Sequence, residues 1–318
     1  PARKFTVRPA LGCATMNVSM SLAICRHRRR NLWTLTGMEY RTDMLTTETK
    51  NPRTGLVDPA DTPALLRLMN EEDRLVPLAV EAELPHIAEA VELAVSALAH
   101  NGRVIYVGAG TSGRLGVLDA SECPPTFGVP PTLVQGFIAG GDIALRHAVE
   151  GAVDDPEAGT ALMDTLGVGE GDLAFGISAS GSARYVIGAV ARAKALGAAT
   201  AAIVNNIGTR LGACADICIA PVVGPEVIAG STRMKCGTSQ KLVLNMISTA
   251  AMVRLGYARG GVMTSLAATN EKLRGRAVRI LCETAGVTEA EAETALVNAD
   301  MRVDRALEYL NVQAQRKE

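Results

Sequence analysis

Aromatic residues make up only 3% of this 318-residue chain, with a single tryptophan among them. Proteins that stack nucleobases or sugar rings on aromatic platforms need more of these side chains. Net charge is also nearly absent, because 32 Lys and Arg residues stand against 33 Asp and Glu residues. Without a positive field, we expect neither a nucleic-acid partner nor attraction to an anionic membrane surface.

Long apolar runs are missing too. The longest uncharged stretch of note, Cys123 to Gly141, contains four prolines and four glycines and therefore cannot span a membrane. The seven cysteines are irregularly spaced, and the lone C-x3-C of Cys214 and Cys218 has none of the four histidines nearby. We expect reduced, buried thiols in a cytoplasmic protein, with no metal site and no cofactor.

Apolar residues and glycines, in contrast, are abundant. Hydrophobic residues make up 48% of the chain, and glycine occurs 31 times, which favours a folded α/β protein of about two domains' length. Residues 1–43 differ from the rest, because the basic run His27 to Arg30 follows a short apolar run, the reverse of a secretory signal. We interpret residues 1–43 as a poorly ordered upstream extension with a solvated basic cluster.

Five short apolar runs alternate with helical patterns. The expected strands are Arg103–Val107, Leu133–Ile138, Asp172–Ile177, Ala199–Val204 and Asp216–Ala220. These runs are apolar throughout rather than at every second residue. Such strands are typical of a parallel sheet that helices cover on both faces.

Helical spacing also precedes and follows the strands. Over residues 62–100 the apolar residues recur at helical spacing, and Pro77 and Pro85 divide this stretch into two or three helices. Further helices are expected over residues 156–166, 182–196, 237–255, 269–284 and, as two short helices with a Thr288/Glu291 capping box, 288–310.

Glycines and hydroxyl side chains follow the first and third expected strands. In an open parallel sheet, ligands bind beyond the carboxyl ends of the strands. Hydroxyls and backbone N–H groups at a helix N-terminus can hold a phosphate without a metal, although serines there can also simply cap the helix. The candidate phosphate and sugar contacts are Thr111, Ser112, Ser178, Ser180, Gly181 and Ser182.

Two nucleotide-binding signatures do not fit these loops. In Gly108–Arg114 (GAGTSGR) the third glycine is misplaced for a dinucleotide site, and no acidic residue properly ends the next strand. Neither loop has the Gly-Lys-Ser/Thr ending of a Walker-type phosphate loop. The sequence therefore favours neither NAD nor Walker-type nucleotide binding.

A third polar block precedes the helix expected over 237–255. Its candidate anion contacts are Glu226, Ser231, Thr232, Arg233 and Lys235. A Ser-Thr-Arg-x-Lys cluster at a helix start favours binding of the same anion or a second one. The alternative is a capped and solvated helix entrance.

Glu122 is the candidate general acid. We expect a short helix over 114–121 that stops at Pro124 and Pro125, so that Glu122 lies near its C-terminal end, where the macrodipole disfavours a carboxylate. Partial burial there raises the pKa of a carboxyl group, which suits a general acid. The ordinary alternative is a capping or solvent-facing glutamate.

Three stretches resemble the N-acetylmuramic acid 6-phosphate etherase family: Gly108–Gly128, Ser178–Gly181 and Gly224–Leu244. Shorter similarities lie at Thr47–Asn51 and Ala268–Leu273, so the resemblance covers roughly residues 45–312. It implies a sugar-isomerase (SIS) fold, with a parallel five-stranded sheet flanked by helices. The implied parts are an N-terminal helical segment over 44–93, an SIS sugar-phosphate domain over 94–257 and a C-terminal helical region over 258–318.

The resemblance also implies a reaction. The family cleaves the lactyl ether on carbon 3 of N-acetylmuramic acid 6-phosphate, which gives N-acetylglucosamine 6-phosphate and D-lactate. Ring opening creates an aldehyde that acidifies the hydrogen on carbon 2; a base removes it, lactate leaves with the help of an acid, and water adds back. By motif match Glu122 takes the acid role, while the hydroxyl loops hold the phosphate and align the reacting carbons.

The implied setting is cytoplasmic recycling of cell-wall amino sugars by a metal-free homodimer. Sites of SIS type are commonly completed by a neighbouring subunit. Glu48 or a histidine could then act across the interface.

One position departs from the family pattern. The second catalytic carboxylate usually lies in a Glu-Gly-Ala-Glu-Asp run, and here Val153 occupies its place. Valine cannot transfer a proton, so Asp154, one residue on, or Glu150 must substitute, and we expect weak activity or activity through Asp154. His147 is a candidate for assisting ring opening, with a packed or solvated histidine as the alternative.

Two other functions remain open from the sequence. Val153 favours a non-catalytic sugar-phosphate sensor on the same fold. An aldose–ketose isomerase shares ring opening and deprotonation at carbon 2 but needs no acid for a departing lactate.

Overall fold

The computed structural model describes residues 45–258, 260–266, 268 and 270–315. The expected extension over 1–43, with its basic run, lies outside the described residues. The division of the remainder at residues 93 and 257 stays a prediction.

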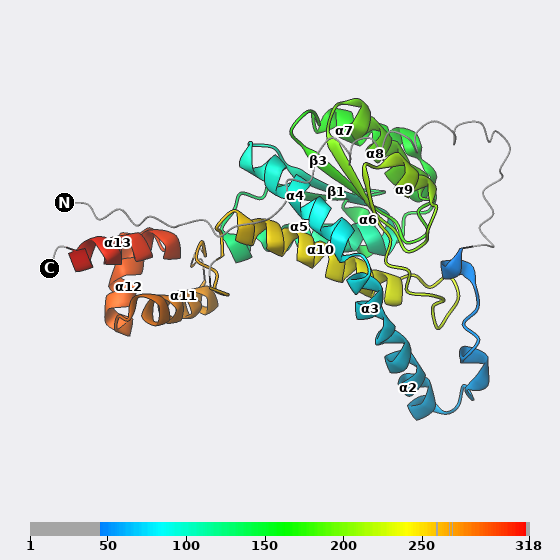
Figure 1. Cartoon of the computed structure of the whole chain (residues 1–318), viewed down its shortest axis with the longest axis horizontal. Helices are drawn as coiled ribbons and strands as arrows, with labels where there is room; N and C mark the ends of the chain where they lie inside the picture. The colour runs from blue at the N-terminus through cyan, green and yellow to red at the C-terminus, as the bar shows by residue number, and fades with distance from the viewer. Residues whose placement is uncertain (1–44, 259, 267, 269, 316–318) are drawn as a thin grey trace, which may run out of the picture. The chain divides into compact units, whose positions relative to one another are not determined.

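The described chain contains a parallel sheet of five strands (Figure 1). Its strands are β1 (Val104–Gly108), β2 (Val134–Ile138), β3 (Leu173–Ile177), β4 (Ala199–Ile203) and β5 (Ile217–Ile219). The strand order is β2-β1-β3-β4-β5, and every neighbouring pair is parallel. These strands confirm the five predicted runs and the parallel sheet.

The strand order changes direction between β1 and β3. From β1 the chain moves outward to β2 and then returns to pair β3 on the other side of β1. Gly108 at the end of β1 pairs in register with Ile177 at the end of β3. Loops leave such a switch point in opposite directions, which opens a crevice at the carboxyl ends of the two strands.

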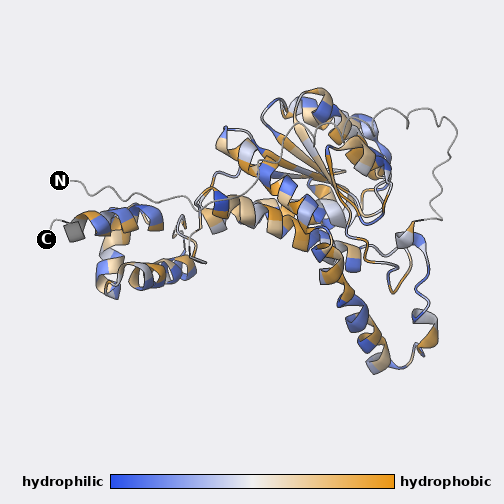
Figure 2. Cartoon of the chain, viewed as in Figure 1, coloured by the Kyte–Doolittle hydropathy of each residue, from blue (hydrophilic) through white to orange (hydrophobic). Residues whose placement is uncertain are grey.

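Helices cover both faces of the sheet, as Figure 1 shows. On one face lie α4 (Leu84–Ala99), α5 (Gly110–Phe127) and α10 (Lys235–Arg254); on the other lie α7 (Pro156–Thr165), α8 (Arg184–Ala195) and α9 (Arg210–Cys214). Strand residues alternate between the two cores, with Tyr106 and Phe175 in the first and Ile105 and Ala174 in the second. This explains why the strands are apolar throughout, as the colouring in Figure 2 shows.

The described part of the chain before the sheet forms three α-helices, within the predicted two or three. The structure has α2 (Thr62–Asp73), α3 (Leu75–Glu81) and α4, and Pro85 occupies the first turn of α4, where its missing N–H costs nothing. Pro77 instead lies inside α3. Among the described residues, no helix has the length and apolarity needed to cross a bilayer.

The C-terminal helices confirm the predicted helical region. They are α11 (Glu271–Ala285), α12 (Glu289–Asn298) and α13 (Val303–Gln315). Thr288 and Glu291 form the predicted capping box at the start of α12. The three helices share an apolar core of their own, which includes Ile280 and Leu296.

The expected end of the helix before Pro124 is wrong. Helix α5 runs from Gly110 through both prolines to Phe127. Cys123 and Phe127 are buried in the core and hold the last turns in place, although each proline removes one helical hydrogen bond. The helix ends at Gly128, whose φ of 65° is left-handed and whose N–H donates to the Pro124 carbonyl at 2.8 Å.

Candidate functional site

A cavity of about 440 Å³ lies where the loops after β1 and β3 meet. It is lined by Glu48, Ala109, Gly110, Thr111, Ser112, Val153, Asp154, Ser178, Ala179, Ser180, Ser182, Ala183, Gly230 and Thr232. Segments from five separate parts of the chain therefore line one cavity. This is the location that the strand order predicts for a ligand.

The loop after β1 contributes the start of α5. Ala109, Gly110, Thr111 and Ser112 line the cavity, so the first turn of this helix faces it. A Cβ on Gly108 would lie 2.5 Å from the Gly113 nitrogen, so glycine is needed for the helix to begin this close to the strand. First-turn N–H groups have no partner within their helix and are suited to an anion.

The loop after β3 contributes three serine hydroxyls. The Gly181 N–H donates to Ser178 Oγ at 3.1 Å, and the Ser182 N–H donates to Ser180 Oγ at 3.3 Å. The hydroxyl oxygens of Ser180 and Ser182 lie 2.7 Å apart in a mutual hydrogen bond. These contacts fold the loop so that its hydroxyls share the cavity wall.

Gly181 fixes the path of this loop. Its φ is +68°, and a Cβ there would lie 2.3 Å from the Thr209 Cβ. The loop backbone therefore packs in direct contact with Thr209, the N-cap residue of α9. Gly181 itself is not part of the cavity lining. The residue at the N-cap of α8 is Ala183, which makes no side-chain cap hydrogen bond, so the capping alternative does not explain these serines.

A short 3-10 turn, η2 (Thr46–Glu48), brings Glu48 into the same cavity. The Gly230 N–H donates to the Thr47 carbonyl at 2.9 Å, which fixes the turn against the third polar block. Glu48 thus lies at the cavity of its own chain, where the sequence considered it only across a subunit interface. Thr47 is fully buried, so this segment packs tightly against the rest of the chain.

The segment before α7 brings in Val153 and Asp154. Both line the cavity from the 3-10 turn η4 (Ala152–Asp154), and both are exposed to solvent. Asp155, the next residue, caps α7 by accepting a hydrogen bond from the Ala158 N–H at 2.9 Å. The two aspartates therefore have different surroundings, and Asp154 is the one at the cavity.

Two other candidates from this region are not at the cavity wall. Glu150 and His147 are both exposed, and neither lines the cavity. Of the two substitutes for the missing carboxylate, the structure brings only Asp154 to the site.

The third polar block is divided by the structure. Thr232 lines the cavity, together with Gly230, whereas Ser231 and the exposed Arg233 do not. Glu226 and Lys235 are buried, at 0% and 1% exposed, and lie away from the cavity. Of the five candidate anion contacts in this block, only Thr232 therefore lines the cavity.

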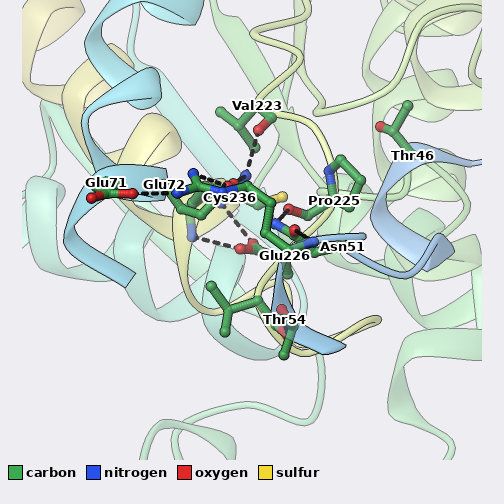
Figure 3. A network of polar contacts seen from close by, with 12 residues as sticks. Thr46, Asn51, Thr54, Glu71, Glu72, Val223, Pro225, Glu226 and Cys236 are labelled. Carbon is green, nitrogen blue, oxygen red and sulfur yellow. Dashed lines mark hydrogen bonds and ion pairs between the residues drawn. The ribbon is translucent and has the colours of Figure 1, made fainter. Parts of the chain in front are cut away.

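Glu226 is itself the anion at the start of α10. Its two oxygens accept the N–H groups of Lys235 and Cys236, each at 3.0 Å (Figure 3). The sequence pattern correctly indicated a helix start that favours negative charge, but a carboxylate of the chain already satisfies it. Burial is the larger cause, and the negative charge of Glu226 the smaller, of a raised pKa of the Cys236 thiol. Cys236 is therefore an unreactive residue that packs in the core.

Lys235 is neutralised by a residue from α2. Its ammonium donates to Glu72 Oε2 at 2.7 Å and to the Val223 carbonyl at 2.8 Å (Figure 3). Burial by itself raises the pKa of Glu72, but hydrogen bonds from Lys235 and Asn51 outweigh it and lower the pKa overall. The pair locks the N-terminal segment to the start of α10.

Glu122 lies on α5 at some distance from the cavity. It is exposed, does not line the cavity, and follows Gly110 by twelve residues, which is about 18 Å along a helix axis. The burial on which its expected acid character depended is absent. The neighbouring Asp119 is the buried carboxylate instead, and it accepts hydrogen bonds from Asn245 and Ser248 at 2.6 and 3.1 Å.

Two buried polar groups beside the site were not predicted from the sequence. Asn206 follows β4 and is 3% exposed, and Glu72 on α2 is 4% exposed. The polar pair Asn205-Asn206 directly after an apolar strand was a usable signal for Asn206. Nothing local marks Glu72, because its partner lies 163 residues away.

The sequence of this chain is similar to known families and proteins. Two family models match: the "SIS domain" over residues 145–252 and the "Glucokinase regulatory protein N-terminal SIS domain" over residues 86–194. The N-acetylmuramic acid 6-phosphate etherase of Brucella anthropi is 49% identical over 83% of this chain and 86% of its own length. That of Yersinia pestis is 53% identical over 83% of this chain and 89% of its own. This chain belongs to the N-acetylmuramic acid 6-phosphate etherase family.

A more distant likeness is to a solved phosphoheptose isomerase from Francisella tularensis, with 20% identity and a TM-score of 0.47 over 62% of this chain and 100% of that one.

The three motifs of this chain that resemble the etherase family each contribute residues to the lining of the cavity. Thr111, Ser112, Ser178, Ser180, Ser182 and Thr232 all line it.

Proposed function

We propose that this chain cleaves the D-lactyl ether of N-acetylmuramic acid 6-phosphate by elimination and then addition of water, releasing D-lactate and N-acetylglucosamine 6-phosphate. Its membership of the etherase family and the convergence of the hydroxyl loops on one cavity support this function. The observation that carries it is that the loops after β1 and β3, which meet at the switch point, line the same cavity. The volume of about 440 Å³ suits a phosphorylated amino sugar.

The phosphate binds at the serine loop. Ser178, Ser180 and Ser182 offer hydroxyls, and the first turn of α5 with Thr111 and Ser112 offers N–H groups and further hydroxyls. These neutral donors can hold a dianion without a metal. Thr232 contributes another hydroxyl to the same wall.

Asp154 is the base that removes the hydrogen on carbon 2. It is the carboxylate next to Val153, and it reaches the cavity while its neighbour Asp155 serves α7. A base must lie within hydrogen-bonding reach of the proton that it takes. Val153 presents an apolar side chain at the same wall and contributes no proton transfer.

Glu122 retains the role of the acid that protonates the departing ether oxygen, on the strength of its motif. Because it is exposed on α5 and outside the cavity of its own chain, this role requires a second subunit that brings a Glu122 to the site. We therefore propose a homodimer with shared sites. Cytoplasmic recycling of cell-wall amino sugars is the setting in which such a substrate arises.

An assay of D-lactate tests the function. The purified chain is incubated with N-acetylmuramic acid 6-phosphate and, in parallel, with N-acetylmuramic acid that lacks the phosphate. We expect D-lactate from the phosphorylated sugar and far less from the other, because the serine loop then has no phosphate to hold. Tight binding without lactate supports the sugar-phosphate sensor, for which Val153 is the motivating observation, and a ketose product supports an isomerase.

A further inference from the structure

Glu48 carries a carboxylate into the cavity from the N-terminal segment. A Cβ built on Gly230 would lie 3.4 Å from Glu48 Oε2, so the carboxylate lies directly over this glycine. The Thr47 hydroxyl donates to Glu48 Oε1 at 3.4 Å. Among the described residues that line the cavity, Glu48 and Asp154 are the acidic ones, and the lining includes no histidine, lysine or arginine.

The backbone around Glu48 is tied to the serine loop by one buried side chain. The Thr46 hydroxyl donates to Asn206 Oδ1 at 2.9 Å, and Asn206 Nδ2 donates to Thr47 Oγ1 at 3.2 Å and to the Ala179 carbonyl at 3.0 Å. Ala179 lies between two of the cavity serines. The position of Glu48 is thus fixed relative to the phosphate loop, as a group that contacts substrate requires.

The residues after Glu48 are held as firmly. Asn51 donates to the Pro225 carbonyl at 3.4 Å (Figure 3), and Thr54 donates to the Val227 carbonyl at 2.9 Å. Both carbonyls belong to the loop that leads to Gly230. The N-terminal segment is therefore a built wall of the cavity.

We propose that Glu48 transfers the protons that open the sugar ring of the bound substrate. The inference rests on the proposed function in so far as the substrate is a 6-phosphorylated amino sugar. A carboxylate repels a phosphate dianion, so a substrate whose phosphate lies in the serine loop presents its sugar end to Glu48. Asp154 is engaged at carbon 2, and His147, the candidate from sequence for ring opening, does not line the cavity.

The step needs no other reactant. The hydroxyl on carbon 1 gives its proton to one oxygen of Glu48, and the electron pair of that O–H bond forms the C1=O double bond. The bond between carbon 1 and the ring oxygen breaks, and its electron pair stays on the ring oxygen. Glu48 then returns the proton to the ring oxygen and is again a carboxylate. The open-chain aldehyde that results is the form whose carbon-2 hydrogen a base can remove.

Exchange between the α and β anomers of N-acetylglucosamine 6-phosphate tests this step, because the ring must open for the anomers to interconvert. Magnetization exchange between the two C1–H signals in NMR gives the rate. We expect the wild-type chain to accelerate the exchange and Glu48→Gln to reduce that acceleration by about 10²-fold, the usual scale of acid–base catalysis. The control is Glu170→Gln, since Glu170 is exposed and precedes β3 at the opposite end of the sheet.

Two results overturn the proposal: a wild-type chain that binds the sugar phosphate without accelerating exchange, and a folded Glu48→Gln variant that exchanges as fast as the wild type. If Glu48→Gln does not fold, Glu48→Asp decides, because a shortened but ionised side chain should lower the exchange rate while N-acetylglucosamine 6-phosphate still binds. Release of D-lactate is measured separately on N-acetylmuramic acid 6-phosphate. Lactate release with exchange independent of Glu48 contradicts this inference alone, and exchange dependent on Glu48 without lactate release contradicts the etherase function alone.

Discussion

The ammonium of Lys235 and the carboxylate of Glu72 form a buried ion pair, 2.7 Å between Nζ and Oε2, with 1% and 6% of the two side chains exposed. The pair joins the N-terminal segment, which carries Glu48, to the start of α10, which follows Thr232. Arg53 also donates to Glu72, at 3.1 Å, so the carboxylate is fully engaged. The cavity wall therefore depends on a charge pair that never touches it.

Removal of one member of this pair should be strongly destabilising. Lys235→Met leaves Glu72 buried without its main partner, and we expect the free energy of unfolding to fall by about 3–5 kcal/mol. Urea denaturation measures it. The double variant Glu72→Met with Lys235→Met should recover much of the loss, because neither charge then remains buried.

The matched control is Lys194→Met, which breaks an exposed ion pair with Asp216 whose side chains are 46% and 44% exposed. We expect a loss below about 1 kcal/mol there. Equal losses at Lys194 and Lys235 would show that burial does not make the Lys235–Glu72 pair more important for stability.

Asp119 and Asp172 should affect the pH dependence of stability in opposite directions. Burial raises the pKa of Asp119, so the folded chain binds a proton where the unfolded chain has lost it, and stability decreases as pH rises through this range. Asp119→Asn keeps an oxygen for Asn245 and Ser248 and removes the buried charge. Its stability relative to the wild type should therefore increase from about pH 4 toward neutral pH.

At Asp172, burial also raises the pKa, but hydrogen bonds from Arg103 and the Gly169 N–H lower it overall. Its contribution is present above the unfolded pKa of about 3.9 and is lost as pH falls through the folded value. Asp172→Asn should accordingly destabilise the chain at pH 7 and less so at acidic pH. Denaturant melts across pH measure both variants, and slopes of the same sign would refute the interpretation.

Gly181 should be required for substrate affinity more than for folding. Gly181→Ala combines a left-handed φ of +68° with a Cβ 2.3 Å from Thr209, so the serine loop must move. Gly171→Ala shares the backbone strain, with φ of +96°, but its Cβ meets no atom within 4 Å. Both variants should lose about 1–2 kcal/mol of stability from the strain.

Steady-state kinetics distinguish the two glycine variants. We expect a raised KM for N-acetylmuramic acid 6-phosphate in Gly181→Ala alone, because Gly181 lies in a loop that lines the cavity and Gly171 does not. A normal KM in Gly181→Ala, or an equal rise in Gly171→Ala, would show that the serine loop does not bind it.

Val153 should limit the rate at which the proton on carbon 2 is removed. Val153→Glu places a carboxylate at the position of the family motif, and we expect kcat to rise. Asp154→Asn in the wild-type background should lower kcat by about 10²-fold or more if Asp154 is the base. An unchanged kcat in Asp154→Asn would place the base elsewhere.

The sheet could be predicted from the sequence because its signal is local. Each strand is a short apolar run, and helices cover both faces of the sheet, so side chains such as that of Phe175 are buried on either face. The meeting of the loops after β1 and β3 at one cavity followed from the same reasoning, since the carboxyl ends of parallel strands lie at one edge of the sheet.

The parts that could not be predicted depend on distant partners. Whether Lys235 faces a ligand is decided by Glu72, and whether α10 accepts an external anion is decided by Glu226. The helix through Pro124 and Pro125 is likewise stabilised by packing of Cys123 and Phe127 rather than by intrinsic propensity. Residue types alone indicate where charge is favourable, not whether the fold already supplies it.

Turnover of N-acetylmuramic acid 6-phosphate in water enriched in oxygen-18 tests the proposed etherase reaction directly. Elimination followed by addition of water breaks the bond between carbon 3 and the ether oxygen. We expect D-lactate to be released with its original oxygen and the oxygen-18 to appear on carbon 3 of N-acetylglucosamine 6-phosphate. No D-lactate, or label in the lactate hydroxyl instead of on carbon 3, would contradict the proposed reaction.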